Sequence, residues 1–290
     1  MDKQSYVDLH IHSTCSDGTM TPEEICQRAA KRGVSLISIC DHNCIDALPR
    51  LAAAAEKQGL CWIKGVELDC AFENRVYHVL AYGFDEKDAA FASLVRENRR
   101  KLDRMSIDLL EKMEADDSRV SMADFLAYEN DPARGGWPAL NYFLDRGIAR
   151  DFDGVMLLYG KYKCSYAKAG FVSVEEACRA IHQAGGFAVL AHPGYSIKGD
   201  RGQYVAQIRR LFTCDLDGIE CIYPLHTSWQ TQDASDFCRQ RELLMTSGSD
   251  CHGEFQKTYA GGILDIGVNK TQLAQLHLGD ISIEGEFTEE

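Results

Sequence analysis

The stretch YVDLHIHS, residues 6–13, decides how this chain is expected to fold and where its chemistry lies. Its apolar and polar residues alternate, which is the pattern of a β-strand. Alternate side chains of a strand share a face, so Asp8, His10 and His12 are expected on one side and the aliphatic residues on the other. Two imidazoles about 7 Å apart on one strand can bind a single metal ion. The pair alone is weak evidence for a metal site, so its surroundings decide.

Six of the nine histidines lie in short segments that follow an apolar, β-rich run and precede a turn or a helix. The segments are DLHIHSTCSDG (8–18), SICDHN (38–43), YHVLAYG (77–83), VLAHPG (189–194) and SGSDCHG (247–253). They are also rich in carboxylates, and mixed imidazole and carboxylate sets suit ions such as manganese, iron and zinc. Six independent coincidences of this kind are a poor explanation. The pattern indicates a multinuclear metal site.

The composition is that of an ordinary globular protein, with 290 residues of which 45% are hydrophobic and 26% charged. This length can bury the core of one α/β barrel or of two modest domains. No run approaches the roughly 20 apolar residues that span a bilayer. The chain enters its first strand almost at once, which leaves no room for a signal peptide. We therefore expect a cytoplasmic protein that does not contact a membrane.

The formal net charge is −13, from 31 basic and 44 acidic residues. Broad nucleic-acid binding relies on basic surface, so long nucleic acids are not expected as partners. An anionic small substrate is still compatible with this charge, because bound divalent ions are often the largest local charges in a site. The sequence carries no signal for an oligomeric state.

Strand and helix patterns alternate through both ends of the chain. The expected strands are 6–12, 34–41, 61–70, 76–84, 187–194, 217–223 and 242–250, with a last edge element at 261–267. The expected helices between them are 22–32, 46–58, 173–184, 201–212 and 228–241. Repeated β–α units with candidate ligands at the carboxyl ends of strands indicate a barrel-like α/β fold, whose active sites lie at that face.

Residues 86–165 interrupt this alternation. Helical periodicity covers 91–114, shorter helical segments follow around 121–128, 137–147 and 151–159, and no strand pattern is convincing. The expected division is therefore a barrel domain made of residues 1–85 and 166–290, with a helical insertion at 86–165 that covers the active-site face.

The histidine segments, together with GVE at 65–67, resemble the PHP (polymerase and histidinol phosphatase) superfamily of metal-dependent phosphoesterases. They occur in the family's order and span residues 8 to 253. The resemblance implies a distorted (β/α)7 TIM-like barrel that binds two to three divalent metal ions. Manganese is the first expectation for these ions, with iron and zinc as the alternatives.

The resemblance also implies a set of nine metal ligands shared among three ions. The first ion would be held by His10, His12, Glu67 and Asp250. The second would share Glu67 as a bridge and add His78 and His192. The third would use Asp17, His42 and His252. Some members of the superfamily carry a histidine where this chain has Asp17, and an aspartate there resembles the small-molecule phosphoesterase branch.

The implied activity is hydrolysis of a phosphate ester of a small metabolite. A nucleoside 3′,5′-bisphosphate or a ribose phosphate is the expected substrate type, with a cyclic phosphodiester as a variant. A water that bridges two divalent ions loses much of its proton affinity, so hydroxide is available near neutral pH. This metal-bridging hydroxide would attack phosphorus in line, and no covalent nucleophile is needed.

Residues outside the ligand set supply the remaining candidates. His226 follows an expected strand and is a candidate to bind phosphate or to protonate the leaving group. Asp41 and Asp8 are candidates to orient the ligand imidazoles, and Asp41 is counted with His226 as catalytic. Besides His226, the candidates for contact with the substrate are Tyr223, Arg134, Lys198 and Arg201.

Four other functions are compatible with parts of this pattern. A 5′-3′ exonuclease acting on short oligonucleotides would use the same centre, and a histidinol-phosphate phosphatase would use the same chemistry. A catalytically inactive PHP scaffold is the non-enzyme alternative, although such copies usually lose ligands. An amidohydrolase also begins with H-x-H, but that family typically bridges its metals with a carboxylated lysine, and here Glu67 fills that position.

Overall fold

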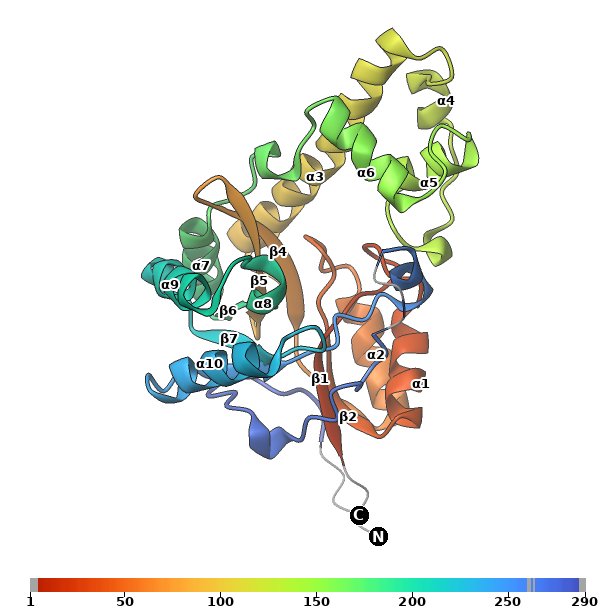
Figure 1. Ribbon diagram of the computed structural model, residues 1–290. Helices are drawn as coiled ribbons and strands as arrows, with labels where there is room; N and C mark the ends of the chain where they lie inside the picture. The colour runs from red at the N-terminus through yellow and green to blue at the C-terminus, as the bar shows by residue number, and fades with distance from the viewer. Residues whose placement is uncertain (1–4, 260–261, 263, 287–290) are drawn as a thin grey trace.

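The computed structural model describes residues 5–259, 262 and 264–286 (Figure 1). Its strands are β1 (Tyr6–Ile11), β2 (Val34–Ile39), β3 (Cys61–Trp62), β4 (Gly65–Phe72), β5 (Arg75–Tyr82), β6 (Phe187–Leu190), β7 (Gly218–Ile222) and β8 (Leu244–Ser247). Its α-helices are α1 (Pro22–Lys31), α2 (Leu48–Gln58), α3 (Ala89–Asp116), α4 (Met122–Leu126), α5 (Pro138–Asp145), α6 (Phe152–Lys161), α7 (Val174–Gln183), α8 (Pro193–Ser196), α9 (Arg201–Leu211) and α10 (Ser228–Arg239). Short 3₁₀ turns are η1 (Pro132–Arg134), η2 (Tyr166–Lys168), η3 (Phe212–Cys214), η4 (Gly253–Thr258) and η5 (Leu273–Gln275).

These strands form two sheets in a mixed α/β fold. The first has the order β1-β2-β3 and is parallel, and the second has the order β4-β5-β6-β7-β8. Strand β5 runs antiparallel to both of its neighbours, whereas β6, β7 and β8 are parallel. Each of the seven expected strand segments contains a strand, but the segment 61–70 is divided between β3 and β4, which belong to different sheets. The run of parallel β–α units is also interrupted at the β4–β5 hairpin.

A closed (β/α)7 barrel is not confirmed. Single-residue bridges join the two sheets, between Ile11 and Cys251 and between His42 and Glu67. One buried cluster also draws side chains from both sheets, including Leu36 of β2. In the described parts of the chain, however, the ladders give eight strands in two separate sheets rather than one seven-stranded ring.

Helices cover the outer faces of both sheets (Figure 1). Helices α1 and α2 contribute to the cluster that packs on the first sheet, and α7, α9 and α10 contribute to the cluster on the second. The predicted N-cap of the first helix is confirmed, because Thr21 forms a capping box with Glu24. Gly59 closes α2 with φ of 65°, a left-handed conformation that glycine adopts without steric cost.

The strict alternation expected for β1 is not what the structure shows. Val7 and Leu9 pack in the cluster shared by both sheets, but Ile11 packs against the helices α1 and α2. The pairing of β1 with β2 is irregular between Asp8 and Ile11. An irregularity of this kind changes the direction of the side chains near it, which here include His10 and His12.

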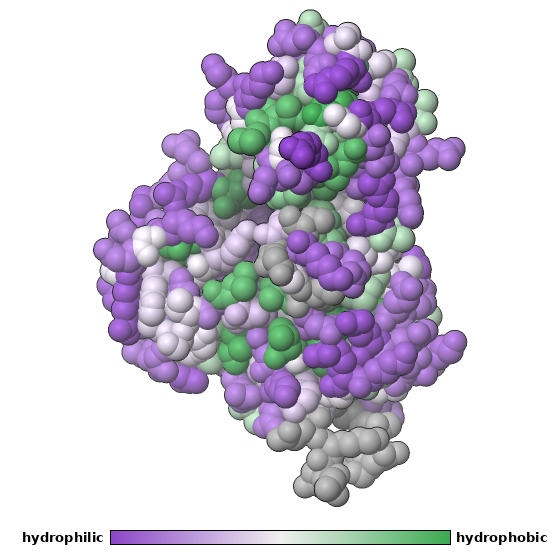
Figure 2. Space-filling model, turned by 45° about the vertical axis from the view of Figure 1, so that its right-hand side comes forward, coloured by the Kyte–Doolittle hydropathy of each residue, from purple (hydrophilic) through white to green (hydrophobic). Residues whose placement is uncertain are grey.

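Residues 86–165, called here the helical segment, contain no strand, as predicted. The first half of α3 packs on the main core through Phe91 and Val95. Its second half forms a separate cluster with α5 and α6 that also includes Phe255, from the turn after β8. Figure 2 shows hydrophobic side chains gathered over the upper part of the molecule, where this segment lies, and exposed members of the segment include Leu126 and Leu157.

Two further expectations concern the edge element and membrane-spanning helices. The edge element expected at 261–267 lies partly outside the described residues, and its described residues form no strand. None of the described helices is both long and apolar enough to cross a membrane.

Candidate metal centre

The predicted metal ligands come together in one place, where the ends of strands from both sheets meet. Four groups of side chains each offer ligand atoms within 4.8 Å of one another. They are His10, His12, Glu67 and Asp250; Glu67, His78 and His192; His12, Asp17, His42 and His252; and His42, Asp69 and His78. The first two groups match two of the predicted sets, and the third contains the remaining set together with His12.

The first group is built around two imidazole nitrogens. Nε2 of His10 and Nε2 of His12 lie 3.1 Å apart. Oε2 of Glu67 lies 3.3 Å from the first and 3.2 Å from the second, and Oδ1 of Asp250 lies 3.1 Å from the second. His10 Nδ1 donates to Oε1 of Glu220 at 3.0 Å, which leaves its Nε2 as an acceptor facing the group.

The second group uses the other oxygen of Glu67. Oε1 lies 2.8 Å from Nδ1 of His78 and 2.9 Å from Nε2 of His192. Because Oε2 faces the first group, one fully buried carboxylate is shared by both groups, as a bridging ligand would be.

The third group includes Asp17, in the loop after β1. Oδ1 of Asp17 lies 3.3 Å from Nε2 of His252 and 3.6 Å from Nδ1 of His12. His252 Nδ1 donates to the backbone oxygen of Asp250 at 2.9 Å, so the nitrogen that faces Asp17 is free to act as a ligand. His12 therefore offers one nitrogen to this group and the other to the first.

The hydrogen bonding of the cluster is incomplete without a cation. Four of its buried polar atoms have no hydrogen-bond partner: Nδ1 of His12, Nδ1 of His42, Oε2 of Glu67 and Oδ1 of Asp69. Buried polar groups are normally paired, and lone pairs that face one another repel. A positive ion among these atoms would give their lone pairs a partner. A ligand set made only of imidazoles and carboxylates, without thiolates, suits a divalent ion. The residues present therefore fit the expected metals.

The ionisation of the cluster follows the same logic. Burial lowers the pKa of His252, but the carboxylates of Asp17 and Asp250 outweigh it and raise this pKa to about 9. Burial alone would raise the pKa of Asp17, but the imidazoles of His252 and His42 hold it well below its usual range. The carboxylates thus stay charged and require positive charge beside them.

Three of the nine non-glycine residues with positive φ in the described chain lie at the cluster. Asn43, His192 and Asp250 have φ angles of 47°, 27° and 55°, in the region that residues other than glycine rarely adopt. Each lies within one residue of a predicted ligand or is one. Strain of this kind persists where the surrounding structure over-determines the backbone, and it clusters at functional sites.

Two carboxylates of the centre were missed from the sequence. Asp69 lies 3.5 Å from Nδ1 of His42 and 3.4 Å from Nε2 of His78. It stands two residues after Glu67 on β4, so strand periodicity could have placed it on the same face. Glu220 binds His10 and also accepts the backbone N–H of His192 at 2.8 Å. Its signal was a lone carboxylate inside the apolar run GIECIY, residues 218–223.

Tyr166 was also missed, and no sequence pattern marked it. It belongs to η2, just after the helical segment, and its hydroxyl lies 3.3 Å from Nε2 of His78. Burial raises the pKa of this hydroxyl well above its usual value, as do the carboxylates of Asp69 and Glu67, so it stays protonated. Tyr166 is therefore a hydrogen-bond donor at the centre.

The predicted orienting residues Asp8 and Asp41 bind backbone and hydroxyl donors instead of ligand imidazoles. Asp8 accepts from the backbone of Ser249 and Gly267, and burial raises its pKa to about 6. Asp41 accepts from the hydroxyls of Ser13 and Ser16 and from the Ser13 backbone. Both carboxylates hold the loops that carry the ligands, and Asp41 is not placed to act on a substrate.

The predicted substrate residue Tyr223 lies at the centre, but the structure does not place His226 as a proton donor there. The Tyr223 hydroxyl donates to Oδ2 of Asp250 at 3.1 Å. His226 uses both ring nitrogens on the backbone, with Nδ1 donating to Cys221 O at 3.2 Å and Nε2 accepting from Gly194 N–H at 3.0 Å. Burial lowers its pKa to about 4, so it is a neutral structural residue.

The three predicted basic residues differ in whether they form ion pairs. Arg134 forms a bidentate ion pair with Asp145, and Arg201 forms one with Asp233. Their guanidinium groups are therefore engaged, which argues against the predicted phosphate contacts. Lys198 has no ion pair with the described residues, and its Nζ lies 4.7 Å from the centroid of the Tyr195 ring.

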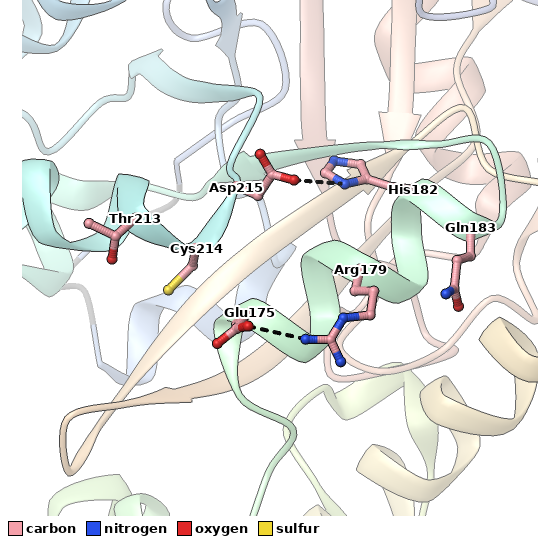
Figure 3. A pocket seen from close by; sticks show the side chains of 7 residues that line it. All are labelled: Glu175, Arg179, His182, Gln183, Thr213, Cys214 and Asp215. Atoms are coloured by element: carbon pink, nitrogen blue, oxygen red, sulfur yellow. Dashed lines mark hydrogen bonds and ion pairs between the residues drawn. The ribbon is translucent and has the colours of Figure 1, made fainter.

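A surface hollow beside α7 lies apart from this cluster (Figure 3). Its side chains pair with one another or with their neighbours, as Glu175 does with Arg179 and His182 with Asp217. None of the predicted site residues lines the hollow. We therefore assign the chemistry to the buried cluster and not to this hollow.

Known proteins share this fold and these motifs. The PHP domain model matches residues 8–122. The 5′-3′ exoribonuclease Rnm of Salmonella typhimurium is 32% identical over 253 residues, which is 84% of each chain. The 3′,5′-nucleoside bisphosphate phosphatase of Chromobacterium violaceum is 28% identical over 251 residues, covering 85% of this chain and 87% of that one.

Solved structures agree on the fold. A proposed metal-dependent phosphoesterase from Bifidobacterium adolescentis superimposes with a TM-score of 0.73 over 94% of both chains, at 24% identity. A protein from Chromobacterium violaceum described as an amidohydrolase, with bound sulfate and no metal, gives a TM-score of 0.68 over 95% of this chain and 99% of that one, at 26% identity.

Together with these relatives, the histidine–carboxylate cluster identifies the chain as a phosphoric ester hydrolase whose site can bind metal ions. The chain belongs to the PHP domain family.

Proposed function

We propose that this chain, a phosphoric ester hydrolase, removes phosphate from a small phosphorylated metabolite. A nucleoside 3′,5′-bisphosphate is the leading substrate type, and a ribose phosphate, including a cyclic phosphodiester form, is the second. The observation that carries the proposal is the convergence of imidazole nitrogens on both oxygens of the buried Glu67, one of which, Oε2, has no hydrogen-bond partner. The bisphosphate phosphatase relative, aligned over most of its length, supports the leading substrate.

We propose that the cluster holds two to three divalent ions, manganese first, with iron or zinc as alternatives. The expected ligands are His10, His12, Glu67 and Asp250; Glu67, His78 and His192; and Asp17, His42 and His252. Divalent ions bound there would lower the pKa of water and neutralise phosphoryl oxygens, which is the chemistry that ester hydrolysis needs.

The chain's own residues then set the geometry. Glu220 holds the Nδ1 proton of His10 and so keeps the ligand nitrogen of that ring turned inward. The Tyr223 hydroxyl fixes one oxygen of Asp250. Tyr166, protonated and beside His78, is the group we propose to donate a hydrogen bond to a phosphoryl oxygen, in place of His226.

We also infer how the chain is divided. The two sheets would be parts of one distorted barrel, because they share an internal cluster and are bridged at Ile11 and at His42. Residues 1–85 and 166–290 would form this barrel domain, and residues 86–165 an insertion over the site. The contact from Gly136 N–H to the backbone oxygen of Asp17, at 2.8 Å, supports that placement.

A second candidate is 5′-3′ exonuclease activity on short oligonucleotides, favoured by the identity to the exoribonuclease relative. The same centre would serve, although the net charge of −13 disfavours long nucleic acids. The amidohydrolase alternative is weaker, because Glu67 joins the first two ligand groups, at the position where that family typically has a carboxylated lysine. The inactive-scaffold alternative is weaker because all nine predicted ligands fall within the four ligand groups.

A substrate panel tests the proposal. Manganese-loaded protein is incubated with adenosine 3′,5′-bisphosphate, ribose 5-phosphate, a cyclic ribose phosphodiester, histidinol phosphate and a 5′-phosphorylated oligoribonucleotide. We expect phosphate release to be fastest from the bisphosphate. Release of mononucleotides from the oligonucleotide at a higher rate would select the exonuclease, and no product from any compound would refute hydrolysis of phosphate esters.

A further inference from the structure

An exposed aromatic ring lies beside the candidate metal centre, and phosphate hydrolysis alone does not explain it. Tyr195 lies on α8, three residues after the candidate ligand His192, and its ring centroid is 5.9 Å from that imidazole. The imidazole is 3% exposed, whereas Tyr195 is 50% exposed. The Tyr195 ring is therefore an exposed group directly beside a buried candidate ligand.

A second exposed ring lies beside another candidate ligand. Tyr259 is 38% exposed, and its ring centroid is 6.2 Å from that of His252. Among the described residues, Tyr195 and Tyr259 are the two aromatic side chains of the exposed class, and both flank the centre.

A positively charged side chain lies next to the Tyr195 ring. Lys198 is exposed, and its Nζ lies 4.7 Å from the centroid of the Tyr195 ring, within the range of a cation–π contact. No ion pair with a described residue engages this ammonium group, whereas Arg134 and Arg201 are bound to carboxylates. Lys198 is thus a cation close to the centre that is available to an anionic ligand.

We infer that Tyr195 and Lys198 recognise the base and the second phosphate of a nucleoside bisphosphate substrate. The Tyr195 ring stacks on the base, and Lys198 pairs with a second phosphate group while the first occupies the metal centre. Stacking on an aromatic ring is tolerant of base identity, so the preference is for any nucleoside bisphosphate over a sugar phosphate. This inference rests on the proposed hydrolase function and assigns its substrate class to particular residues.

The test compares three substrates that differ by one group each. Adenosine 3′,5′-bisphosphate has a base and two phosphates, AMP has a base and one phosphate, and ribose 5-phosphate has no base. The Tyr195→Ala variant should raise KM about tenfold or more for both adenosine compounds, with KM for ribose 5-phosphate unchanged. Tyr195→Phe keeps the ring and should restore the wild-type values.

Lys198→Ala should raise KM for the bisphosphate and leave AMP unaffected, because AMP lacks the second phosphate. The matched control is Lys161→Ala, since Lys161 makes a similar contact, 4.9 Å from the ring centroid of Tyr162, at the end of α6. It should leave all three KM values unchanged. Calorimetry with a phosphonate analogue of AMP, which cannot be hydrolysed, should show the same loss of affinity in Tyr195→Ala.

The outcomes separate this inference from the function on which it rests. A wild type that releases phosphate from none of the three compounds contradicts the proposed function, and calorimetry then still measures recognition. An active wild type whose Tyr195→Ala variant binds the adenosine compounds normally, or loses all three substrates equally, overturns the inference. Preference of the wild type for ribose 5-phosphate over both adenosine compounds would overturn it as well.

Discussion

Glu67 is the residue on which the candidate centre depends most. Its two carboxylate oxygens lie within 3.3 Å of five imidazole nitrogens, those of His10, His12, His42, His78 and His192. Burial alone would raise its pKa, but the imidazoles of His42, His78 and His10 hold it well below the usual range. A single buried carboxylate therefore joins strands from both sheets to one centre.

Replacing Glu67 with glutamine keeps the volume and removes the charge. We expect the metal content of the Glu67→Gln variant to fall and kcat/KM for the best substrate to drop by at least about 100-fold, since even outer partners of metal ligands are worth about 10- to 100-fold. Glu56→Gln, on the exposed side of α2, is the matched control and should behave as wild type. An active Glu67→Gln variant with full metal content would contradict the bridging role.

A variant of Glu220 tests whether the residues hydrogen-bonded to the candidate ligands orient them. Its two oxygens serve two donors, Nδ1–H of His10 and the backbone N–H of His192. Glutamine offers one oxygen, so the Glu220→Gln variant can serve only one of these donors. We expect its manganese affinity, measured by titration of the metal-free protein, to weaken about 10- to 100-fold with an unchanged circular dichroism spectrum. An unchanged affinity would mean that Glu220 does not orient these ligands.

At the scale of elements, the turn after β8 connects the metal centre to the helical segment. This turn, η4, begins directly after His252, and its Phe255 is 5% exposed. The ring packs edge-on against Trp137 and Phe152 of the helical segment. The core of that segment is thus completed by a residue three positions from a candidate ligand.

The Phe255→Ala variant should therefore be destabilised by about 3–5 kcal/mol, the usual cost of removing a buried aromatic side chain. Urea denaturation measures this difference. Leu157→Ala, on α6 of the same segment, is the control, because Leu157 is 74% exposed and its loss should cost less than about 0.5 kcal/mol. Equal stabilities of the two variants would show that Phe255 does not hold the segment.

Strand periodicity explains which parts of the site the sequence could reveal. The six histidines were marked by their place after apolar runs and before turn residues, and the resemblance to the PHP superfamily implied Asp17, Glu67 and Asp250 as further ligands. The alternation of side chains along β4 would also have added Asp69. Tyr166 could not be found from the sequence. Its position beside His78 depends on how the long helical segment before it folds, and no local sequence pattern describes that. The ion pairs of Arg134 and Arg201 could not be foreseen, because their partners, Asp145 and Asp233, lie 11 and 32 residues further along the chain.

For the whole molecule, the topology was only partly predictable. The positions and order of most strands followed from apolar runs and turn residues, although β6 and β8 end before the expected residues 194 and 250. The antiparallel direction of β5 did not, because an apolar run reads the same in either direction. The separation into two sheets depends on long-range pairing across β8 and β1, which the sequence does not specify.

The pH dependence of folding is a property of the whole molecule to which His226 makes a defined contribution. Burial lowers the pKa of His226 from 6.5 to about 4, so the folded state excludes a proton that the unfolded chain binds. Its contribution is therefore complete above pH about 6.5 and is lost as the pH falls toward 4. Between pH 7 and pH 5 the loss is about 2 kcal/mol, at about 1.4 kcal/mol per pH unit.

Urea denaturation of wild type and His226→Gln at both pH values isolates this contribution. We expect the wild type to lose about 2 kcal/mol more than the variant on going from pH 7 to pH 5. Groups that titrate in both proteins cancel in the comparison. Equal losses would show that His226 is protonated as readily in the folded protein as in the unfolded chain.

The central claim is that this molecule is built around a multinuclear metal centre, and its metal content tests that claim most directly. The purified protein is stripped with a chelator, reconstituted with manganese, desalted and analysed by mass spectrometry for metal per chain. We predict at least two equivalents in the wild type and a lower content in Glu67→Gln. Fewer than two equivalents in the wild type would contradict the account.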